Sequence, residues 1–419
     1  MATNTLRGMT LDGARDAGLD PDRLRHAFGL LETWTQGGVV PGAGALIARD
    51  GKVAGEAYLG SARRGTSRTV DSDTIWSLAS VTKPFTATAV LQLVESGQLS
   101  LDEPIYRGFP EFLDAPTTAF DRRAVTLRHV LTHTSGLPGV SEDNIALRQA
   151  HRPLEDFVRS YCRQPLFFAA GAAHLYSNPA ILTAAEVASR ASSGELGKLV
   201  ERPRVDRIHD LIATQILGPL GMRDSSMKPP GEWSERIAWV EGTGQEGTDY
   251  EMGNSAYYRG LGIPWGGLFS TPRDLGRFVD AFLPDAAGKA RLGLAEGEGH
   301  RIVSPATART MTTIQFAPPD APPEIATNQR DGAPETPPRP AVAWGLGWEV
   351  KGQKRGHRCG DLTSSETYSH AGATGTMVWA DPATGSLCVL LTNQTLASGW
   401  TSERPRQAMF SNAIAAAVL

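Results

Sequence analysis

The sequence has few cysteines, no long apolar run and no marked excess of charge, and each absence removes a class of protein. The three cysteines, Cys162, Cys359 and Cys388, lie far apart and form no Cys-x-x-Cys pair. Their spacing therefore indicates neither a zinc site nor a disulfide framework. No apolar stretch is long enough to span a bilayer. A net charge of -4 over 419 residues gives no electrostatic reason to expect nucleic-acid binding.

Several sequence motifs that mark other enzyme classes are also missing. There is no Gly-x-Ser-x-Gly elbow, no phosphate-binding loop and no His-Glu-x-x-His pair. We therefore expect no metal and no cofactor. The first residues lack the basic flank and apolar centre of a secretion signal, so we expect a cytoplasmic location. Residues 1–18 are polar and contain glycine, which is typical of a loose N-terminal arm.

One stretch does carry chemistry, because it places Ser80 three residues before Lys83. Apolar residues recur at helical spacing behind it and predict a long amphipathic helix that ends near Ser96-Gly97. Residues three apart share one face of a helix. A hydroxyl would then lie beside an amine, as a nucleophile and its base require. Pro84 follows directly and removes a helical N–H, so we expect a distorted first turn.

The same spacing occurs a second time, at Ser225 and Lys228, and shows that the pattern alone is weak. This copy runs into Pro229-Pro230, which no helix can follow. We interpret it as a surface loop. The first copy differs from it in having an apolar approach and a helix behind it.

The order of predicted elements indicates a discontinuous domain organisation. A helix over 21–34 and a hairpin over 43–59 come first, helices fill the middle, and strands over 344–350, 375–380 and 386–393 come last. We expect the two ends to build one α/β domain, 19–78 with 255–419, around a mainly α-helical domain, 79–254. The proline-rich segment 317–340 cannot form a regular core element, and is either a solvated surface loop or a lid at the site.

Two further motifs occur once each, Tyr176-Ser177-Asn178 and His370-Ala371-Gly372. With Ser80 and Lys83, in this order, they resemble the serine β-lactamase/penicillin-binding-protein superfamily. The resemblance is strongest to the branch of class C β-lactamases, DD-peptidases, D-aminopeptidases and family VIII carboxylesterases, and it covers roughly residues 20–419. It implies an α/β fold in which helices flank an antiparallel sheet that carries an all-α insertion.

The resemblance also implies roles for the residues of the three motifs. Ser80 is the expected nucleophile, and its backbone N–H forms the oxyanion hole with that of Ala373. Lys83 serves as base only if burial keeps it neutral. Tyr176 is the second candidate base, and the two remain unseparated because they can titrate as one system.

Two positions in these motifs, and a histidine outside them, keep a second interpretation open. Asn178 would bind a substrate carbonyl or position Lys83, but an asparagine before proline is also typical of a turn. The resemblance implies that His370 and Gly372, of the third motif, bind the substrate. His370 stands where many relatives have a lysine that holds the substrate carboxylate, and this weakens the case for β-lactams because histidine is only partly charged near neutrality. A strand-capping role is the alternative for His370. His133 is a possible triad base, but its surrounding phrase indicates a structural role.

The sequence therefore predicts a serine hydrolase that acts on small esters through an acyl-enzyme. A D-aminopeptidase, DD-peptidase or weak β-lactamase is the alternative, followed by an acyltransferase on the same site. A binding protein without chemistry is a further alternative, disfavoured because all three motifs are present. The expected partner is a small ester or amide substrate, with neither nucleic acid nor membrane.

Overall fold

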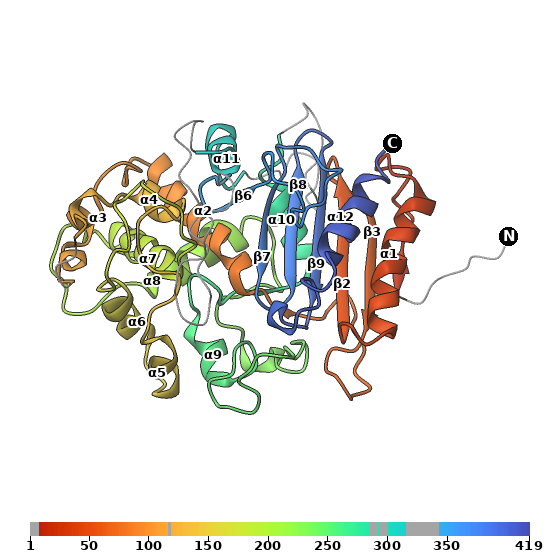
Figure 1. The fold of residues 1–419 in the computed structure, drawn as a ribbon, viewed down its shortest axis with the longest axis horizontal. Helices are drawn as coiled ribbons and strands as arrows, with labels where there is room; N and C mark the ends of the chain where they lie inside the picture. The colour runs from red at the N-terminus through yellow and green to blue at the C-terminus, as the bar shows by residue number, and fades with distance from the viewer. Residues whose placement is uncertain (1–7, 116–118, 285–291, 293–300, 316–342) are drawn as a thin grey trace.

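An antiparallel sheet forms the centre of the molecule (Figure 1). The computed structural model describes residues 8–115, 119–284, 292, 301–315 and 343–419. Over these residues the sheet has seven strands in the order β1-β3-β2-β9-β8-β7-β6, and every neighbouring pair is antiparallel. A two-stranded ladder pairs β4 with β5. The strands are β1 (Met9–Thr10), β2 (Gly42–Arg49), β3 (Lys52–Gly60), β4 (Trp76–Ser77), β5 (Phe269–Ser270), β6 (Glu349–Val350), β7 (Tyr368–Gly372), β8 (Thr376–Asp381) and β9 (Ser386–Thr392).

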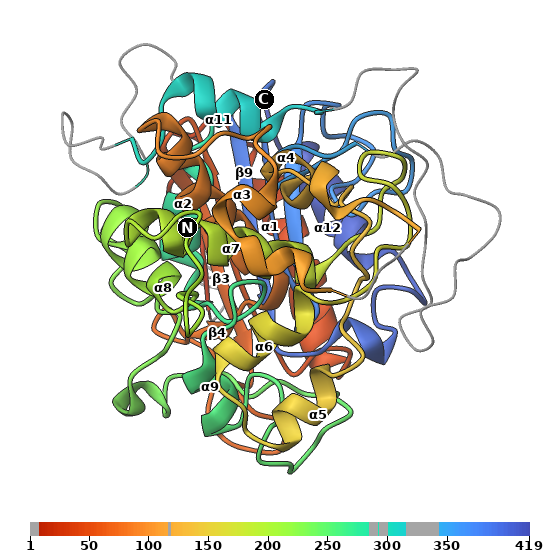
Figure 2. The same cartoon turned by 90° about the vertical axis from the view of Figure 1, so that its left-hand side faces the viewer.

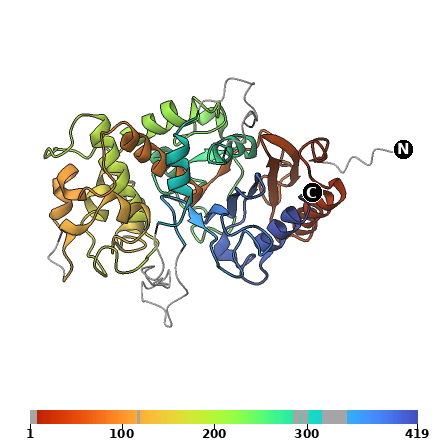
Figure 3. The same cartoon turned by 90° about the horizontal axis from the view of Figure 1, so that it is seen from above.

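Helices cover both faces of this sheet and continue into a second, helical part. In Figure 1, α1 and α12 lie along the outer face and α10 lies behind the sheet, while α3 to α8 form a separate group beyond α2. Figure 2 shows this group from its own side, and Figure 3 shows it beside the sheet. The α-helices are α1 (Pro21–Gln36), α2 (Lys83–Glu95), α3 (Ile105–Gly108), α4 (Leu127–Leu131), α5 (Asn144–Gln149), α6 (Leu154–Tyr161), α7 (Asn178–Ser192), α8 (Arg207–Ile212), α9 (Ala256–Leu261), α10 (Pro272–Asp280), α11 (Pro305–Thr312) and α12 (Arg406–Ala415).

The central strands are apolar on both faces because each face has its own core. Along β9, Leu387 and Val389 join the core that contains α2, α7 and α10. Cys388 and Leu390, which alternate with them, join the core under α1 and α12. Successive side chains of a strand point to opposite faces, so a two-sided core requires an unbroken apolar run. This architecture is the expected one, a β-lactamase/transpeptidase-like α/β fold with helical additions.

Helix α2 corrects one expectation, since it is not amphipathic. Every residue from Lys83 to Leu91 is buried. The helix packs against α7 and α8 of the helical part as well as against the turn before it. A helix enclosed by both parts of the molecule is apolar all round, and Gly97 ends it with a left-handed φ of 74°.

The N-terminal arm and the last strand region also differ from expectation. The described part of the arm is packed, because Met9–Thr10 pairs with β3 and Ala14 and Ala17 are buried. The strand expected over 344–350 is only Glu349–Val350. In the helical middle of the chain, α5 ends at Gln149 and α6 begins after Pro153. The expected lid or loop 317–340 lies outside the described residues, and the domain boundaries stay a prediction.

A buried ion cluster fixes α7, the helix that begins at the Tyr-x-Asn motif. Arg190 Nε lies 2.6 Å from Glu186 Oε1, and its Nη1 lies 2.8 Å from Glu111 Oε2. The side chains of Arg190 and Glu186 are 1% and 0% exposed. Burial raises the pKa of Glu186 to about 7, although Arg190 opposes the rise. Removing the arginine would leave a carboxyl group buried without its cation.

Arg190→Met should therefore lower the free energy of unfolding by about 3–5 kcal/mol, the usual result of breaking a buried ion pair from one side. Urea unfolding followed by circular dichroism measures it. Arg207→Met is the control, because the pair of Arg207 with Asp210 is more than half exposed and its loss costs less than about 1 kcal/mol. Equal effects of the two substitutions would contradict the structural role given to Arg190.

Candidate active site

Ser80 lies on a distorted turn where strand β4 passes into helix α2. Residues Ala79–Thr82 form a 3₁₀ turn, and the helix begins only at Lys83. Ala79 has a φ of +46°, a left-handed conformation that costs a residue with a Cβ roughly 1 kcal/mol or more. The distortion expected from Pro84 is thus present, but it falls before the lysine, since Lys83 has ordinary helical angles (φ -58°, ψ -43°). Its N–H bonds the carbonyl of Ser80.

The lysine of the first motif lies against the serine. Lys83 Nζ donates to Ser80 Oγ at 3.0 Å and to the carbonyl oxygen of Trp265 at 3.0 Å. The Lys83 side chain is fully buried, whereas Ser80 is half-buried. Burial holds the pKa of Lys83 well below its usual value of 10.5. A neutral amine that retains a lone pair is what the removal of a serine proton requires.

Tyr176 completes the group at the serine. Lys83 Nζ lies 4.7 Å from the centroid of the Tyr176 ring. Burial raises the pKa of the Tyr176 phenol above its usual 10, and a hydrogen bond with the Ser80 side chain opposes that rise. The phenol is therefore protonated at neutral pH. Ser80 and Lys83 thus lie beside Tyr176, which is distant from them in the sequence.

His133 packs against the ring of Tyr176 and bonds the backbone of the next residue. Its ring centroid is 4.5 Å from that of Tyr176, and its Nδ1 accepts the backbone N–H of Ser177 at 3.2 Å. His133 has a left-handed φ of +58° and is buried, which lowers its pKa far below 6.5. Because Nδ1 is occupied by this contact, His133 positions the Tyr-x-Asn segment, in agreement with the structural interpretation of its phrase.

Strand β7 closes the other side of the site. Its Gly372 lies so close to the turn that an added Cβ would come within 2.1 Å of the carbonyl oxygen of Leu78. Two threonines fasten the same edge: Thr374 Oγ1 donates to the Ser77 carbonyl at 2.6 Å, and Thr376 Oγ1 donates to the Leu78 carbonyl at 2.8 Å. The following N–H, of Ala373, has no acceptor among the described residues.

His370 carries no charge in this environment. It is 3% exposed, and burial lowers its pKa to about 3. Its Nδ1 contacts the carbonyl of Ala371 at 3.0 Å, while Nε2 is buried and has no described partner. The third motif therefore offers a neutral hydrogen-bonding group where the resemblance would place a cation.

Asn178 stands at the first position of α7, after its cap Ser177. Its Oδ1 is buried with no hydrogen-bond partner among the described residues. The described partners of the lysine are Ser80 and Trp265 rather than Asn178. Asn178 thus has a buried amide oxygen without a described partner, and among the described contacts the carbonyl of Trp265, rather than Asn178, positions the lysine.

The second serine–lysine pair is separated in space. Ser225 is buried and bonds Ser270 and Asp274 at 2.7 and 2.8 Å. Lys228 Nζ instead pairs with Asp206 at 3.3 Å. The expectation of a surface loop was wrong for this serine, because the segment bridges to β5. The pair has no shared pocket and cannot act as a nucleophile and base.

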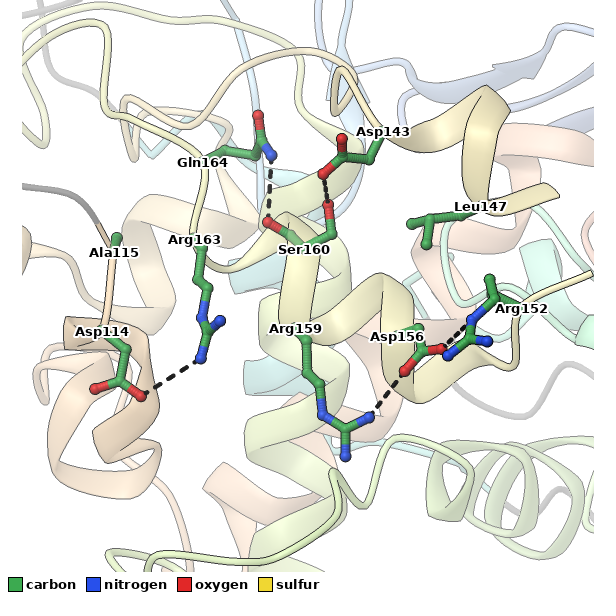
Figure 4. Close-up of a pocket in the computed structure, with 10 residues that line it drawn as sticks. All are labelled: Asp114, Ala115, Asp143, Leu147, Arg152, Asp156, Arg159, Ser160, Arg163 and Gln164. Carbon is green, nitrogen blue, oxygen red and sulfur yellow. Dashed lines mark hydrogen bonds and ion pairs between the residues drawn. The ribbon is translucent and has the colours of Figure 1, made fainter. Parts of the chain in front are cut away.

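A large surface pocket on the helical part is a separate feature (Figure 4). It has a volume of about 770 Å³ and lies between α5, α6 and the segment around Asp114. The carboxylate of Asp156 pairs with Arg152 and Arg159 at 2.6 and 2.8 Å, and Asp143 accepts from Ser160. Its charges are largely matched within the pocket, and none of the three motifs contributes to its described lining. It offers no chemistry comparable to that of Ser80.

The described residues hold neither a metal cluster nor a helix suited to a bilayer. No group of three or more His, Cys, Asp or Glu side chains in these ranges has the arrangement of a metal site. Among the described helices, none has the length and apolar character that crossing a bilayer requires. The cytoplasmic location stays a prediction.

The sheet, the helical insertion and the serine on the turn before α2 together define a β-lactamase/transpeptidase-like fold. A family model described as Beta-lactamase matches residues 30–408, and the chain belongs to this family.

Relatives of the chain include both an esterase and a penicillin-binding protein. The chain is 37% identical over 198 residues to Esterase EstB of Burkholderia gladioli, an alignment that covers 44% of this chain and 46% of the esterase. It is 28% identical over 375 residues to Penicillin-binding protein 4 of Amycolatopsis lactamdurans, which covers 88% and 84%. Among solved structures, EstCE1, a hydrolase with promiscuous acyltransferase activity, superposes with a TM-score of 0.68 at 20% identity over 94% and 99%. The sequence similarity to Esterase EstB thus spans about half the length of that esterase, whereas the superposition on EstCE1 covers nearly the whole of both chains.

Proposed function

We propose that this protein hydrolyses small carboxylic esters through an acyl-enzyme on Ser80. The observation that carries the proposal is the 3.0 Å contact between Ser80 Oγ and a fully buried Lys83 amine. The esterase similarity supports the reaction class. The uncharged His370 favours neutral groups beside the scissile bond.

In this mechanism, neutral Lys83 accepts the Ser80 proton as Oγ attacks the ester carbonyl. The N–H groups of Ser80 and Ala373 stabilise the oxyanion of the tetrahedral intermediate. The protonated phenol of Tyr176 donates a proton to the departing alkoxide and takes one from protonated Lys83, which returns the amine to its neutral form. Water then attacks the acyl-enzyme and releases the acid, and Ser80 is protonated again. Asn178 Oδ1, without a partner in the site, would accept a hydrogen bond from the substrate.

A fluorophosphonate tests the nucleophile directly. We expect one covalent adduct per chain, mapped by peptide mass spectrometry to Ser80, together with loss of 4-nitrophenyl butyrate hydrolysis. Ser225, the serine of the second Ser-x-x-Lys pattern, is the internal control and should carry no adduct. The absence of an adduct on Ser80 would contradict the proposal and favour a binding protein.

A DD-peptidase or weak β-lactamase is the second candidate, because the penicillin-binding relative aligns over most of the chain. A panel of nitrocefin, a D-alanyl-D-alanine peptide and a D-amino acid amide, the last for a D-aminopeptidase, separates these activities from ester hydrolysis. Added alcohol acceptors would accelerate turnover if acyl transfer dominates, and the promiscuous acyltransferase activity of EstCE1 is the reason to include them.

A further inference from the structure

Arg148, on helix α5, is a buried cation without a partner. It is 7% exposed, and its Nε is fully covered with no hydrogen bond. No carboxylate among the described residues forms an ion pair with it, and no described acceptor takes any of its N–H groups. An arginine remains charged at all ordinary pH values. Of its nitrogens only Nε is fully covered, so the two Nη groups remain able to donate to an anion that reaches them.

The other well-buried arginines of the described chain show how unusual this is. Arg122 donates to three backbone carbonyls, of Phe112, Gln164 and Cys162. Arg190 pairs with two carboxylates, as described above. The fold thus supplies acceptors for these buried guanidinium groups and leaves that of Arg148 open.

Arg148 lies against the ring of Tyr258, and its charge also acts on two other tyrosines. Its guanidinium carbon is 5.2 Å from the centroid of the Tyr258 ring. Burial raises the phenol pKa values of Tyr161, Tyr257 and Tyr258, and the charge of Arg148 opposes the rise in each. A cation–π contact contributes about 0.5–2 kcal/mol, which is less than the desolvation of a guanidinium. The rings hold the cation in place but do not neutralise it.

The tyrosines near Arg148 also contact the segment that packs on the turn carrying Ser80. Tyr258 donates to the carbonyl of Gly266 at 3.3 Å, and a Cβ on Gly266 would lie 3.6 Å from the backbone carbon of Ala79. The preceding Trp265 gives its carbonyl to Lys83 and packs its ring 5.2 Å from that of Tyr161. Helices α5, α6 and α9, which carry these residues, lie next to one another below α2 (Figures 1 and 2). A chain of contacts through the Tyr258 ring and the Gly266 backbone therefore connects Arg148 to the turn that carries Ser80.

We propose that Arg148 is a specificity-determining residue that binds a carboxylate of the substrate at a distance from the scissile ester. The preferred substrates are esters that carry one anionic group on a short chain. This inference rests on the proposed ester hydrolysis and deepens it. The negative group is supplied by the substrate, which completes the pairing that the fold leaves open at Arg148.

The test compares two 4-nitrophenyl esters of nearly equal length. Mono-4-nitrophenyl glutarate ends in a carboxylate, and 4-nitrophenyl valerate ends in a methyl group. We expect kcat/KM to be about 10- to 100-fold higher for the glutarate ester, the range for a charge-assisted hydrogen bond. Arg148→Gln should remove this preference and keep valerate turnover, and Arg148→Lys should restore part of it.

The carboxylate of a substrate can also belong to its alcohol part. A second comparison therefore uses 3-carboxy-4-nitrophenyl butyrate and 4-nitrophenyl butyrate. In each comparison, the ratio of kcat/KM for the charged ester to that for the neutral ester is divided by the same ratio in Arg148→Gln. This division cancels the difference in intrinsic chemical reactivity between the two esters. Arg152→Gln is the matched control, because this exposed arginine four residues away already pairs with Asp156 and its loss should leave both ratios unchanged.

Each outcome decides the inference. Wild-type ratios near one in both comparisons would overturn it, even if Arg148→Gln fails to fold. A ratio that Arg152→Gln changes as much as Arg148→Gln would also overturn it, as a general charge effect. Failure of the wild type to hydrolyse either neutral ester instead refutes the proposed function itself.

Discussion

Replacing Ser80 with alanine should lower kcat/KM for 4-nitrophenyl butyrate by roughly 10⁴-fold, because no other group near the oxyanion donors can form the acyl-enzyme. Initial rates over a range of substrate concentrations give the value, and circular dichroism checks the fold. The half-buried side chain of Ser80 makes no contribution to either core, so stability should change little.

Ser225→Ala is the control for this experiment. It alters the second serine–lysine pattern and removes hydrogen bonds to Ser270 and Asp274. The expected cost is about 1–3 kcal/mol of stability with activity per folded molecule unchanged. Substantial activity in Ser80→Ala, or its loss in Ser225→Ala alone, would reverse the assignment of the nucleophile.

Lys83→Met should also reduce kcat/KM, on the order of 10³-fold, since general-base catalysis contributes about 10²- to 10⁴-fold. Methionine keeps the apolar bulk in a fully buried position but cannot take a proton. In the wild type, kcat/KM should fall as pH drops through the pKa of Lys83. Because burial lowers that pKa, this limb lies well below pH 10.5. A pH–rate profile of wild type, with Lys83→Arg as an always-charged comparison, measures it.

The same substitution should raise stability while it removes activity. The unfolded lysine has a pKa near 10.4, and the folded one has a lower pKa. Between these two values the unfolded chain binds more protons, so wild-type stability rises with pH through this window. Lys83→Met removes this pH dependence of the stability, and it also removes the free-energy cost of burying an amine that is protonated in the unfolded chain at neutral pH. A wild-type activity limb near pH 10, or an active Lys83→Met protein, would contradict a neutral lysine base.

The core of the site was predictable from sequence because it depends on local spacing. Ser80 and Lys83 are three residues apart, and helical geometry alone predicts their contact. Tyr176 required the resemblance, since nothing local ties it to the serine. The carbonyl of Trp265 could not be foreseen, because a backbone acceptor 182 positions away leaves no sequence signal.

The wrong predictions share a physical cause, which is burial set by tertiary packing. Helix α2 looked amphipathic because apolar residues recur at helical spacing, but contacts on all sides bury its threonines too. Ser225 looked exposed because prolines follow it, yet a bridge to β5 encloses it. The packed residues after Met9 looked like an arm because a two-residue strand has no pattern of its own. Arg148 was invisible for the same reason, since a lone arginine is ordinarily at the surface.

The pairing of β2 with β9 joins segments about 340 residues apart, from Ala43 with Thr392 to Arg49 with Ser386. During synthesis, α2 and the helical group leave the ribosome long before Thr374 and Thr376 can form their hydrogen bonds to the turn beside Ser80. The nascent chain therefore carries its serine and lysine without the edge that aligns them. Hydrolytic competence should appear late and abruptly, when the last strands have been translated and the sheet closes.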